Sequence, residues 1–268
     1  MTPIHVNTDI SASAGYSEYE INTERDLELN LSLLKDCDIF IRITACPKLR
    51  VRAFAAEGVK ASVLFWNESE GKLEADESWE VMGNAHVTAA YCECNAADTE
   101  RTIYGGLRGA GADMLVSTAS LVRSKKTYHI QTVNHAPHTY GDMKNFAVVL
   151  KEGTLMIDAV GKVVKGAYGS ESHQTSRAMS FEEGQRTTIL PELLIDENDV
   201  QASHAMSIGR VDDDVLYYMM SRGLNLQQCT SLISTGYLMP ITEVIANEEL
   251  RTKLREELER KMSDLCSM

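Results

Sequence analysis

PELLIDENDVQASHAMSIGRVDDDVLYYMMSRG, residues 191–223, contains the point at which the hydrophobic pattern of the chain changes. Its first half is an extended run with apolar residues at 193–195 and Val200, and it continues through His204 to Gly209. Three aspartates, residues 212–214, then precede apolar residues at helical spacing. Acidic residues in the first turn of a helix are stabilised by the helix dipole. We therefore predict that this stretch joins a strand-rich region to a helical one.

The composition is that of an acidic globular protein. The 268 residues are 44% hydrophobic and 24% charged, with a formal net charge of -13. A chain of this length can bury a full core. Nucleic acids and anionic membranes bind clustered Lys and Arg, so this net charge argues against both as main partners.

Several features predict a cytoplasmic protein. The N-terminus lacks the basic start and apolar core of a signal peptide, and no apolar run approaches the roughly 20 residues of a spanning helix. The six cysteines are scattered, which suits reduced thiols better than a disulfide framework. We therefore expect the chain to be cytoplasmic.

Upstream of the joint, the pattern predicts strands and turns. Residues 1–22 are polar and rich in Ser and Thr, and we expect a flexible N-terminal arm there. Alternating leucines over 27–33 predict a half-buried strand, whereas the acidic interval 71–80 predicts a solvated turn. Short strand-like runs then follow one another to about residue 203 without an amphipathic helix. We predict a mainly β core over 23–208, compatible with a sandwich, a barrel or a β-solenoid.

Downstream of the joint, residues 209–268 are predicted to form a small helical domain. Gly223 lies where a left-handed cap would end the first helix. A second helix contains Leu226, Leu232 and Ile233, and Pro240 opens a third. The last helix has apolar residues at 250, 254, 258 and 262, with charged residues on its other faces. Such apolar stripes are suited to packing or to binding a partner.

No motif for nucleotide binding or hydrolysis is present. The glycine-rich segment 105–111 lacks the Lys and Ser/Thr that follow a Walker loop, so a tight corner between strands is the favoured interpretation. There is no GxSxG and no HExxH. An isolated histidine at a strand end, such as His204, is more often a structural residue.

Two groups of residues are weaker candidates for a metal site. Cys92 and Cys94 would face the same way on a strand and could hold a soft metal, but no second pair completes a four-thiolate site. His135 and His138, with His129 nearby, could supply imidazole ligands. Strand packing is favoured for the cysteines, and hydrogen bonding to strand-end backbone for the histidines.

From Thr127 to about Lys261, the sequence resembles the C-terminal core of the SufB/SufD family of iron–sulfur cluster assembly proteins. The similarity is densest in DVQASHAMSIGRVDDDVLYYMMSRG, and it extends to TYHIQTVNHAPHTYGD and GKVVKGAYGSESHQTSRAM. Residues 1–100 match only loosely, and family members usually have a longer N-terminal region. SufB-like members place a cysteine near residues 174–179, where this chain has Thr175, Ser176 and Arg177. The chain therefore resembles the SufD-like members.

This resemblance implies a right-handed parallel β-helix followed by a helical C-terminal domain. It further implies a complex with an ABC-type, SufC-like ATPase, docked on the helices around Leu226, Leu232 and Ile233, and with a SufB-like β-helix subunit. A transient iron–sulfur cluster or iron would lie at the interface between the two β-helix subunits, with His204 as a ligand. The ATP chemistry would belong to another subunit, so no nucleotide is expected on this chain.

On this interpretation the chain is a scaffold or accessory subunit and not an enzyme. One alternative is a minimal scaffold that pairs with a second copy of itself. Another is a β-helix enzyme acting on polysaccharides, which needs clustered carboxylates and sugar-stacking aromatics. Only 6% of the residues are aromatic, and the appended helices also count against the enzyme.

Overall fold

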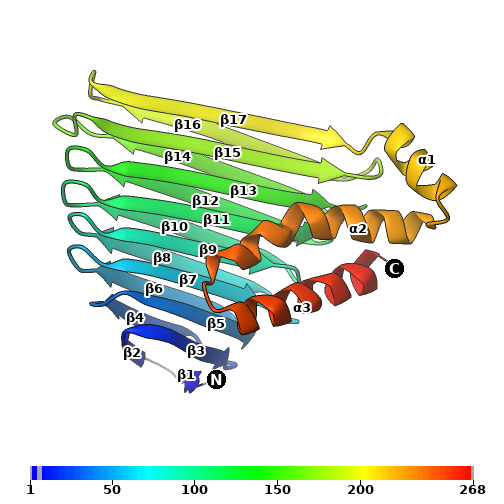
Figure 1. The fold of residues 1–268 in the computed structure, drawn as a ribbon, viewed down its shortest axis with the longest axis horizontal. Helices are drawn as coiled ribbons and strands as arrows, with labels where there is room; N and C mark the ends of the chain where they lie inside the picture. Colours follow the sequence, from blue (N-terminus) through cyan, green and yellow to red (C-terminus); the bar gives the residue numbers. More distant parts are fainter. Residues whose placement is uncertain (1, 5–7, 267–268) are drawn as a thin grey trace.

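A computed structural model describes residues 2–4 and 8–266, in which two parallel β-sheets are followed by helices (Figure 1). The first sheet, here called the odd sheet, contains in spatial order β1 (Thr2–Ile4), β3 (Gly15–Asn22), β5 (Cys37–Ala45), β7 (Lys60–Asn67), β9 (His86–Glu93), β11 (Asp113–Val122), β13 (Tyr140–Val149), β15 (Ser170–Ser180) and β17 (Val200–Arg210). The second, the even sheet, contains β16 (Arg186–Ile195), β14 (Thr154–Val163), β12 (Lys125–Asn134), β10 (Thr99–Leu107), β8 (Leu73–Val81), β6 (Lys48–Ala55), β4 (Leu27–Leu33) and β2 (Thr8–Ser11).

Among the described strands, the chain crosses to the other sheet after each strand, so that each strand pairs with the strands two before and two after it in the chain. β11, for example, pairs in parallel with β9 and β13, and β12 with β10 and β14. This connectivity makes the core a parallel β-helix. The predicted β-helix core with C-terminal helices is confirmed, and the sandwich and barrel are ruled out.

Alternation of apolar and polar residues explains why the strands form. In β4, the four leucines between Leu27 and Leu33 are at most 2% exposed, whereas the residues between them are exposed or half-buried. These leucines belong to one large apolar cluster between the sheets, which continues through most coils. Burial on this inner face supplies the main driving force for stacking the coils.

Two segments differ from the sequence-based expectation. Residues 71–80, predicted to be a solvated turn, contain most of β8, because Leu73, Ala75, Glu77 and Trp79 all point inward despite the acidic residues between them. The flexible arm predicted for 1–22 is instead strand at Gly15–Asn22, where β3 pairs along β5. Backbone pairing with a buried neighbour outweighs the polar composition of that segment.

The helices are α1 (Asp213–Ser221), α2 (Leu226–Leu238), the 3-10 helix η1 (Met239–Val244) and α3 (Glu248–Cys266). The Asp212 side chain accepts a hydrogen bond from the Asp214 backbone N–H at the start of α1, and Asn225 forms a capping box with Gln228 in α2. Gly223 has φ +98°, as predicted for a left-handed cap after α1.

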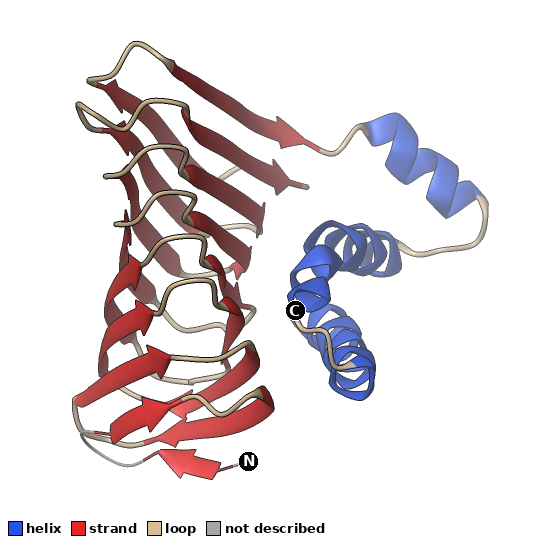
Figure 2. Ribbon diagram, turned by 60° about the vertical axis from the view of Figure 1, so that its left-hand side comes forward, coloured by secondary structure: helices blue, strands red, loops and turns tan. Residues whose placement is uncertain are grey.

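The helices α2, η1 and α3 lie against one face of the β-helix, the outer face of the odd sheet, whereas α1 projects away from the sheets after β17 (Figure 2). Leu250, Leu254, Leu258 and Met262 of α3 are at most 5% exposed, and they belong to the same apolar cluster as Phe40 and other outward-facing side chains of the sheet. Arg42 of β5 forms ion pairs with Glu68 and with Glu257 of α3, at 2.5 and 3.1 Å. Within the described residues, no helix has the length and apolar character needed to cross a membrane.

Candidate functional site

The last coil of the β-helix, β16 and β17, is more exposed than the coils beneath it. Each of these strands is the end strand of its sheet, so one backbone edge of each has no neighbouring strand among the described residues (Figure 1). Every residue of β17 after Val200 is exposed. Apolar side chains contribute to this surface: Leu190, Leu194, Ile195, Met206 and Ile208 are each 37% to 49% exposed. An unpaired strand edge with exposed apolar residues is a site for pairing with another chain.

His204 lies in the middle of β17 and on its inner face. It pairs in register with Gln174 of β15, whose side chain is 2% exposed. Ala178, four residues after Gln174 on the same face of β15, belongs to the apolar cluster between the sheets. This face of β15 therefore points inward, and so does the face of β17 that carries His204. The His204 side chain is exposed and has no hydrogen bond or ion pair with any described residue. Both ring nitrogens are therefore available to a ligand or a partner.

The inner face below His204 is polar. Gln174 donates a hydrogen bond from Nε2 to the Glu192 carbonyl oxygen at 2.7 Å, while its buried Oε1 has no partner among the described residues. Buried oxygens of Ser172, Thr132 and Asn134 are likewise unpaired within the described chain. Because an unsatisfied buried polar atom is costly, this region is suited to water or another hydrogen-bonding ligand.

A separate hydrogen-bonded chain lies on the outer face of the same two strands. His173 of β15 contacts Ser203 Oγ through Nδ1 at 2.7 Å and Glu171 Oε2 through Nε2 at 3.0 Å. Ser203 precedes His204, so their side chains point to opposite faces of β17. Sequence inspection did not identify this group, because the register of β15 and β17 brings together residues that are 30 apart.

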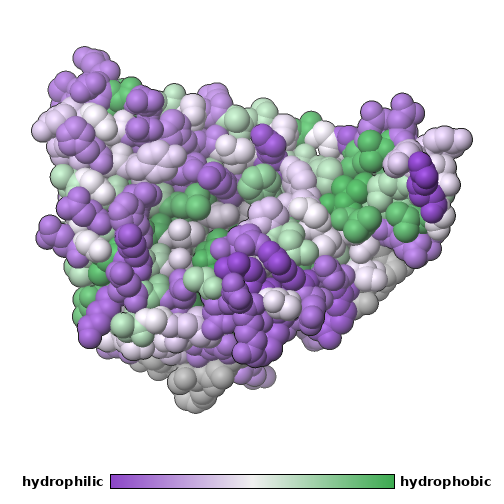
Figure 3. Space-filling view, in the orientation of Figure 1, coloured by the Kyte–Doolittle hydropathy of each residue, from purple (hydrophilic) through white to green (hydrophobic). Residues whose placement is uncertain are grey.

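The predicted docking residues, Leu226, Leu232 and Ile233, all lie on α2. Leu226 and Leu232 of α2 are 49% and 58% exposed, whereas Ile233 is half-buried against Val211, Leu216 and Cys229. Four apolar residues of α1 extend this surface: Val215, Tyr217, Tyr218 and Met220. Figure 3 shows the resulting hydrophobic patch over α1. We call these six exposed residues the helical patch.

The weaker metal candidates are dispersed in the structure. His135 Nε2 contacts the Tyr104 hydroxyl at 3.0 Å, and burial followed by the nearby Arg108 charge lowers the pKa of His135. His138 has φ +56° and packs edge-on against Tyr168. Cys92 and Cys94 are in contact beneath α3. They lie at the end of β9, which is separated from the His204 strand β17 by three strands of the odd sheet. The described residues contain no cluster of three or more His, Cys, Asp or Glu that could hold a metal ion.

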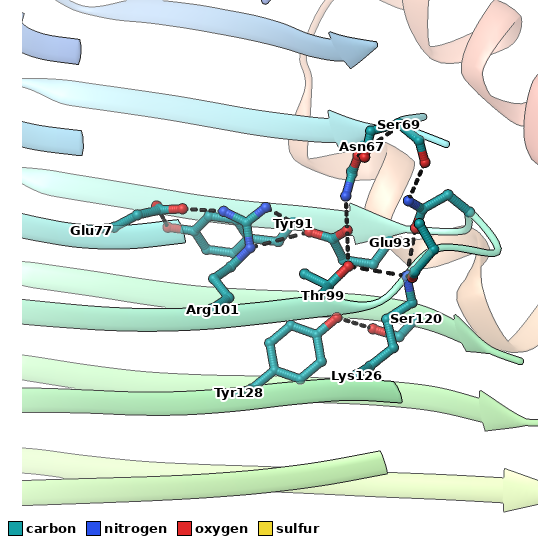
Figure 4. A network of polar contacts seen from close by, with 12 residues as sticks. Asn67, Ser69, Glu77, Tyr91, Glu93, Thr99, Arg101, Ser120, Lys126 and Tyr128 are labelled. Carbon is teal, nitrogen blue, oxygen red and sulfur yellow. Dashed lines mark hydrogen bonds and ion pairs between the residues drawn. The ribbon is translucent and has the colours of Figure 1, made fainter. Parts of the chain in front are cut away.

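A fully buried ionic network occupies the middle coils (Figure 4). Arg101 of β10 binds Glu77 of β8 and Glu93 of β9, with its Nη2 2.6 Å from Glu93 Oε1. Burial disfavours the guanidinium charge, but the carboxylates of Glu93 and Glu77 outweigh it and raise the pKa of Arg101. Lys126 joins the network through Asn95 Oδ1 and Thr99 Oγ1. The sequence does not indicate this network, because Glu77, Glu93 and Arg101 lie on three different strands and charged strand residues are usually exposed to solvent.

Comparison with known proteins identifies the family to which this sequence is similar. A family model described as "SUF system FeS cluster assembly, SufBD core domain" matches residues 50–237. The iron-sulfur cluster assembly protein SufD of Bacillus subtilis is 30% identical over 216 residues, which are 68% of this chain and 49% of that protein. SufD of Escherichia coli is 25% identical over 107 residues, 40% of this chain and 25% of that protein. An iron-sulfur cluster assembly SufBD family protein of Mycobacterium tuberculosis is 28% identical over 171 residues, 59% and 43% respectively. The chain thus spans about half the length of these relatives, or less.

Proposed function

Because the chain belongs to the SufB/SufD family of iron–sulfur cluster assembly proteins and is SufD-like, we propose that it is a non-catalytic scaffold subunit for cluster assembly. The nascent cluster, or its iron, is the substrate, and it is held between this chain and a second β-helix subunit. The observation that carries the proposal is the open terminal coil with His204 on its inner face.

His204 serves as an iron ligand in this proposal. An imidazole binds iron through one nitrogen while the other is oriented by a hydrogen-bond acceptor. Gln174 is the neighbour in register, and its buried, unpaired Oε1 is available as that acceptor. A single imidazole cannot hold a cluster by itself, so the remaining ligands come from the partner.

The partner is a SufB-like subunit or a second copy of this chain, bound along β16 and β17. Pairing there would satisfy the unpaired backbone edges and cover Met206 and Ile208. It would also enclose His204, because this residue shares the inner face with Met206 and Ile208. Sizing the purified chain alone and with its partners would separate a homodimer from a heteromer.

The helical patch is the docking surface for an ABC-type ATPase. The chain has no Walker motif, so nucleotide chemistry has to come from another subunit. Aromatic and Met side chains such as Tyr217 and Met220 are enriched at protein interfaces, which fits this surface. The helices also lie against the odd sheet, which ends at β17, so motion of the ATPase can reach the terminal coil.

Replacement of His204 tests the iron-ligand role. His204→Ala should abolish cluster formation by the complete complex while leaving the complex assembled, since the side chain has no partner within the described chain. The matched control is His129→Ala, which removes a half-exposed histidine paired with Asp158 on the even sheet. Cluster content is measured by absorption and iron analysis. Unchanged cluster formation in His204→Ala would exclude the assignment.

Charge substitution tests the docking surface. The double variant Leu226→Glu and Leu232→Glu should lose co-purification with the ATPase while the β core remains folded by circular dichroism. Phe54→Glu is the control, because Phe54 is an exposed apolar residue (42%) on β6, away from the helical patch. Retained ATPase binding by the double variant would place the dock elsewhere.

A further inference from the structure

Cys92 and Cys94 form a dithiol on the outer face of the odd sheet. Cys92 lies in β9 between Trp66 and Ala119 of the adjacent strands, and Cys94 follows the end of β9. Their sulfur atoms are 3.6 Å apart, and the side chains are 1% and 2% exposed. Both belong to the buried cluster that contains Leu258 and Met262 of α3.

The surroundings distinguish the two sulfurs. The Cys92 S–H donates a hydrogen bond to Cys94 Sγ, which lowers the pKa of Cys94. Burial of Cys94 opposes this shift, but the Lys261 and Lys126 ammonium groups favour the thiolate, and the pKa of Cys94 is lowered on balance. Burial instead raises the pKa of Cys92 well above its ordinary value. Cys94 is therefore the sulfur that more readily becomes a thiolate, which is the nucleophilic form of cysteine.

A pocket reaches Cys94 of this pair. Its volume is about 290 Å³, and its lining includes Cys94, Asn95, Lys261 and Glu68. Lys261 of α3 is fixed at the wall by an ion pair with Glu68 at 2.8 Å. Cys92 does not line the pocket, so a molecule in it would meet Cys94 first.

We propose that Cys94 and Cys92 are a reactive dithiol that reduces small disulfides entering this pocket, with Cys94 as the attacking sulfur and Cys92 as the resolving one. The Cys94 thiolate attacks a disulfide R–S–S–R, forming Cys94–S–S–R and releasing R–S⁻. The Cys92 sulfur then attacks Cys94 Sγ, its proton passes to the departing thiolate, and a second R–SH leaves. The products are a Cys92–Cys94 disulfide and two thiols, so two electrons move from the protein to the small disulfide.

Other cysteines of the chain offer an internal comparison. Burial raises the pKa of Cys37 and of Cys46 to about 11 in each case, and the Cys46 S–H donates to the Lys48 carbonyl oxygen. Neither has the combination of a contacting thiol and flanking ammonium groups that Cys94 has. They should therefore react only slowly in the folded protein.

The test uses the full chain and the neutral probe bis(2-hydroxyethyl) disulfide, with acid quenching and peptide mapping by mass spectrometry. The wild type should lose two hydrogens and yield a peptide containing the Cys92–Cys94 disulfide. Cys92→Ser should stop at a mixed disulfide on Cys94, and Cys94→Ser should react at least tenfold more slowly. Cys46→Ser is the matched control and should keep the wild-type rate.

A further variant separates reactivity from folding. Lys261→Gln should slow the first step several-fold while the protein stays folded, because it removes a charge that favours the thiolate. The proposal is overturned if Cys92 and Cys94 react no faster than Cys37 and Cys46, or if a mixed disulfide forms on Cys92 first. No cluster or partner subunit enters the measurement, so its outcome is independent of the proposed role in cluster assembly.

Discussion

The central coils and the terminal coil of the same β-helix use polar and apolar residues in opposite ways. In the centre, Arg101, Glu77 and Glu93 are fully buried and paired with one another. In the terminal coil, apolar residues such as Met206 and Ile208 are nearly half exposed, and His204 has no hydrogen-bond or ion-pair partner among residues 2–4 and 8–266. The central coils thus bury and pair their own charged groups, whereas the terminal coil leaves apolar side chains and a histidine exposed.

This difference follows from position in the stack. A central coil has a neighbour on each side, so both of its backbone edges and its inner side chains are covered. In the part of the chain that the structure describes, the terminal coil has a neighbouring coil on one side only, and the chain turns away into α1 after β17. Polar and apolar inner-face residues therefore stabilise the fold in the central coils, whereas in the terminal coil they are accessible to another molecule.

The largest expected difference in unfolding free energy is between a charge placed on the inner face of a central coil and the same charge placed on the inner face of the terminal coil. Ile157→Asp in β14, at a side chain that is 1% exposed, should cost more than about 4 kcal/mol of unfolding free energy, because it buries an unpaired carboxylate. Ile208→Asp in β17 should cost about 1 kcal/mol or less in the isolated chain. Urea unfolding measures both. Equal losses would mean that the terminal coil is as closed as the centre.

A smaller effect is expected from breaking the buried ionic network. Arg101→Met leaves two buried carboxylates without their cation and should cost about 3–5 kcal/mol. The control Arg50→Met removes an exposed arginine that pairs with Glu28 at 2.6 Å on the outer face of the even sheet, and it should change the stability little. A loss for Arg101→Met as small as the control's would show that the central network is dispensable for stability.

The smallest effect is expected at Glu68, which pairs with Lys261 of α3 where this helix packs on the odd sheet. Burial disfavours the ionised carboxylate of Glu68, but Lys261 and Arg42 outweigh it and lower the pKa of Glu68. Its ionised form therefore stabilises the fold above its ordinary pKa, and this contribution is lost as the pH falls through the lowered value. Glu68→Gln should reduce stability by about 1 kcal/mol at neutral pH.

The pH dependence provides the check on this prediction. Unfolding curves of the wild type and Glu68→Gln should converge as the pH falls below the lowered pKa of Glu68, because the wild-type carboxylate is then protonated in the folded state as well. Glu74→Gln, which alters an exposed ion pair with Lys72, is the control and should change the curves little. A difference that persists undiminished in acid would assign the stability to packing and not to charge.

Much of the fold could be predicted from local patterns. Alternating leucines located β4, the change of period after Gly209 located α1 to within a few residues, and Gly223 marked the cap that follows it. The same patterns missed β8, because its outward-facing acidic residues resemble a solvated turn and only stacking buries the residues between them. A period of two also fits a sandwich, so the β-helix followed from the family resemblance and not from the pattern.

The candidate site was only partly accessible from the sequence. His204 was identified through the matched motif, and the exposure of Leu226 and Leu232 suits the docking role proposed for them. Gln174 could not be linked to His204, since they are 30 residues apart and meet only through the register of β15 and β17. The contact between Cys92 and Cys94 fits the period of a strand, but Lys261 comes from the far end of the chain.

The sequence by itself determined where strands give way to helices and which face of each recognised strand is apolar, because both depend on the spacing of residues along the chain. The tertiary structure alone decided which coil is left open, which carboxylates are buried around Arg101 and what lies beside His204 and Cys94. These depend on contacts between residues far apart in sequence. Whether a side chain stabilises the core or is available to a partner is set by whether another coil lies against it.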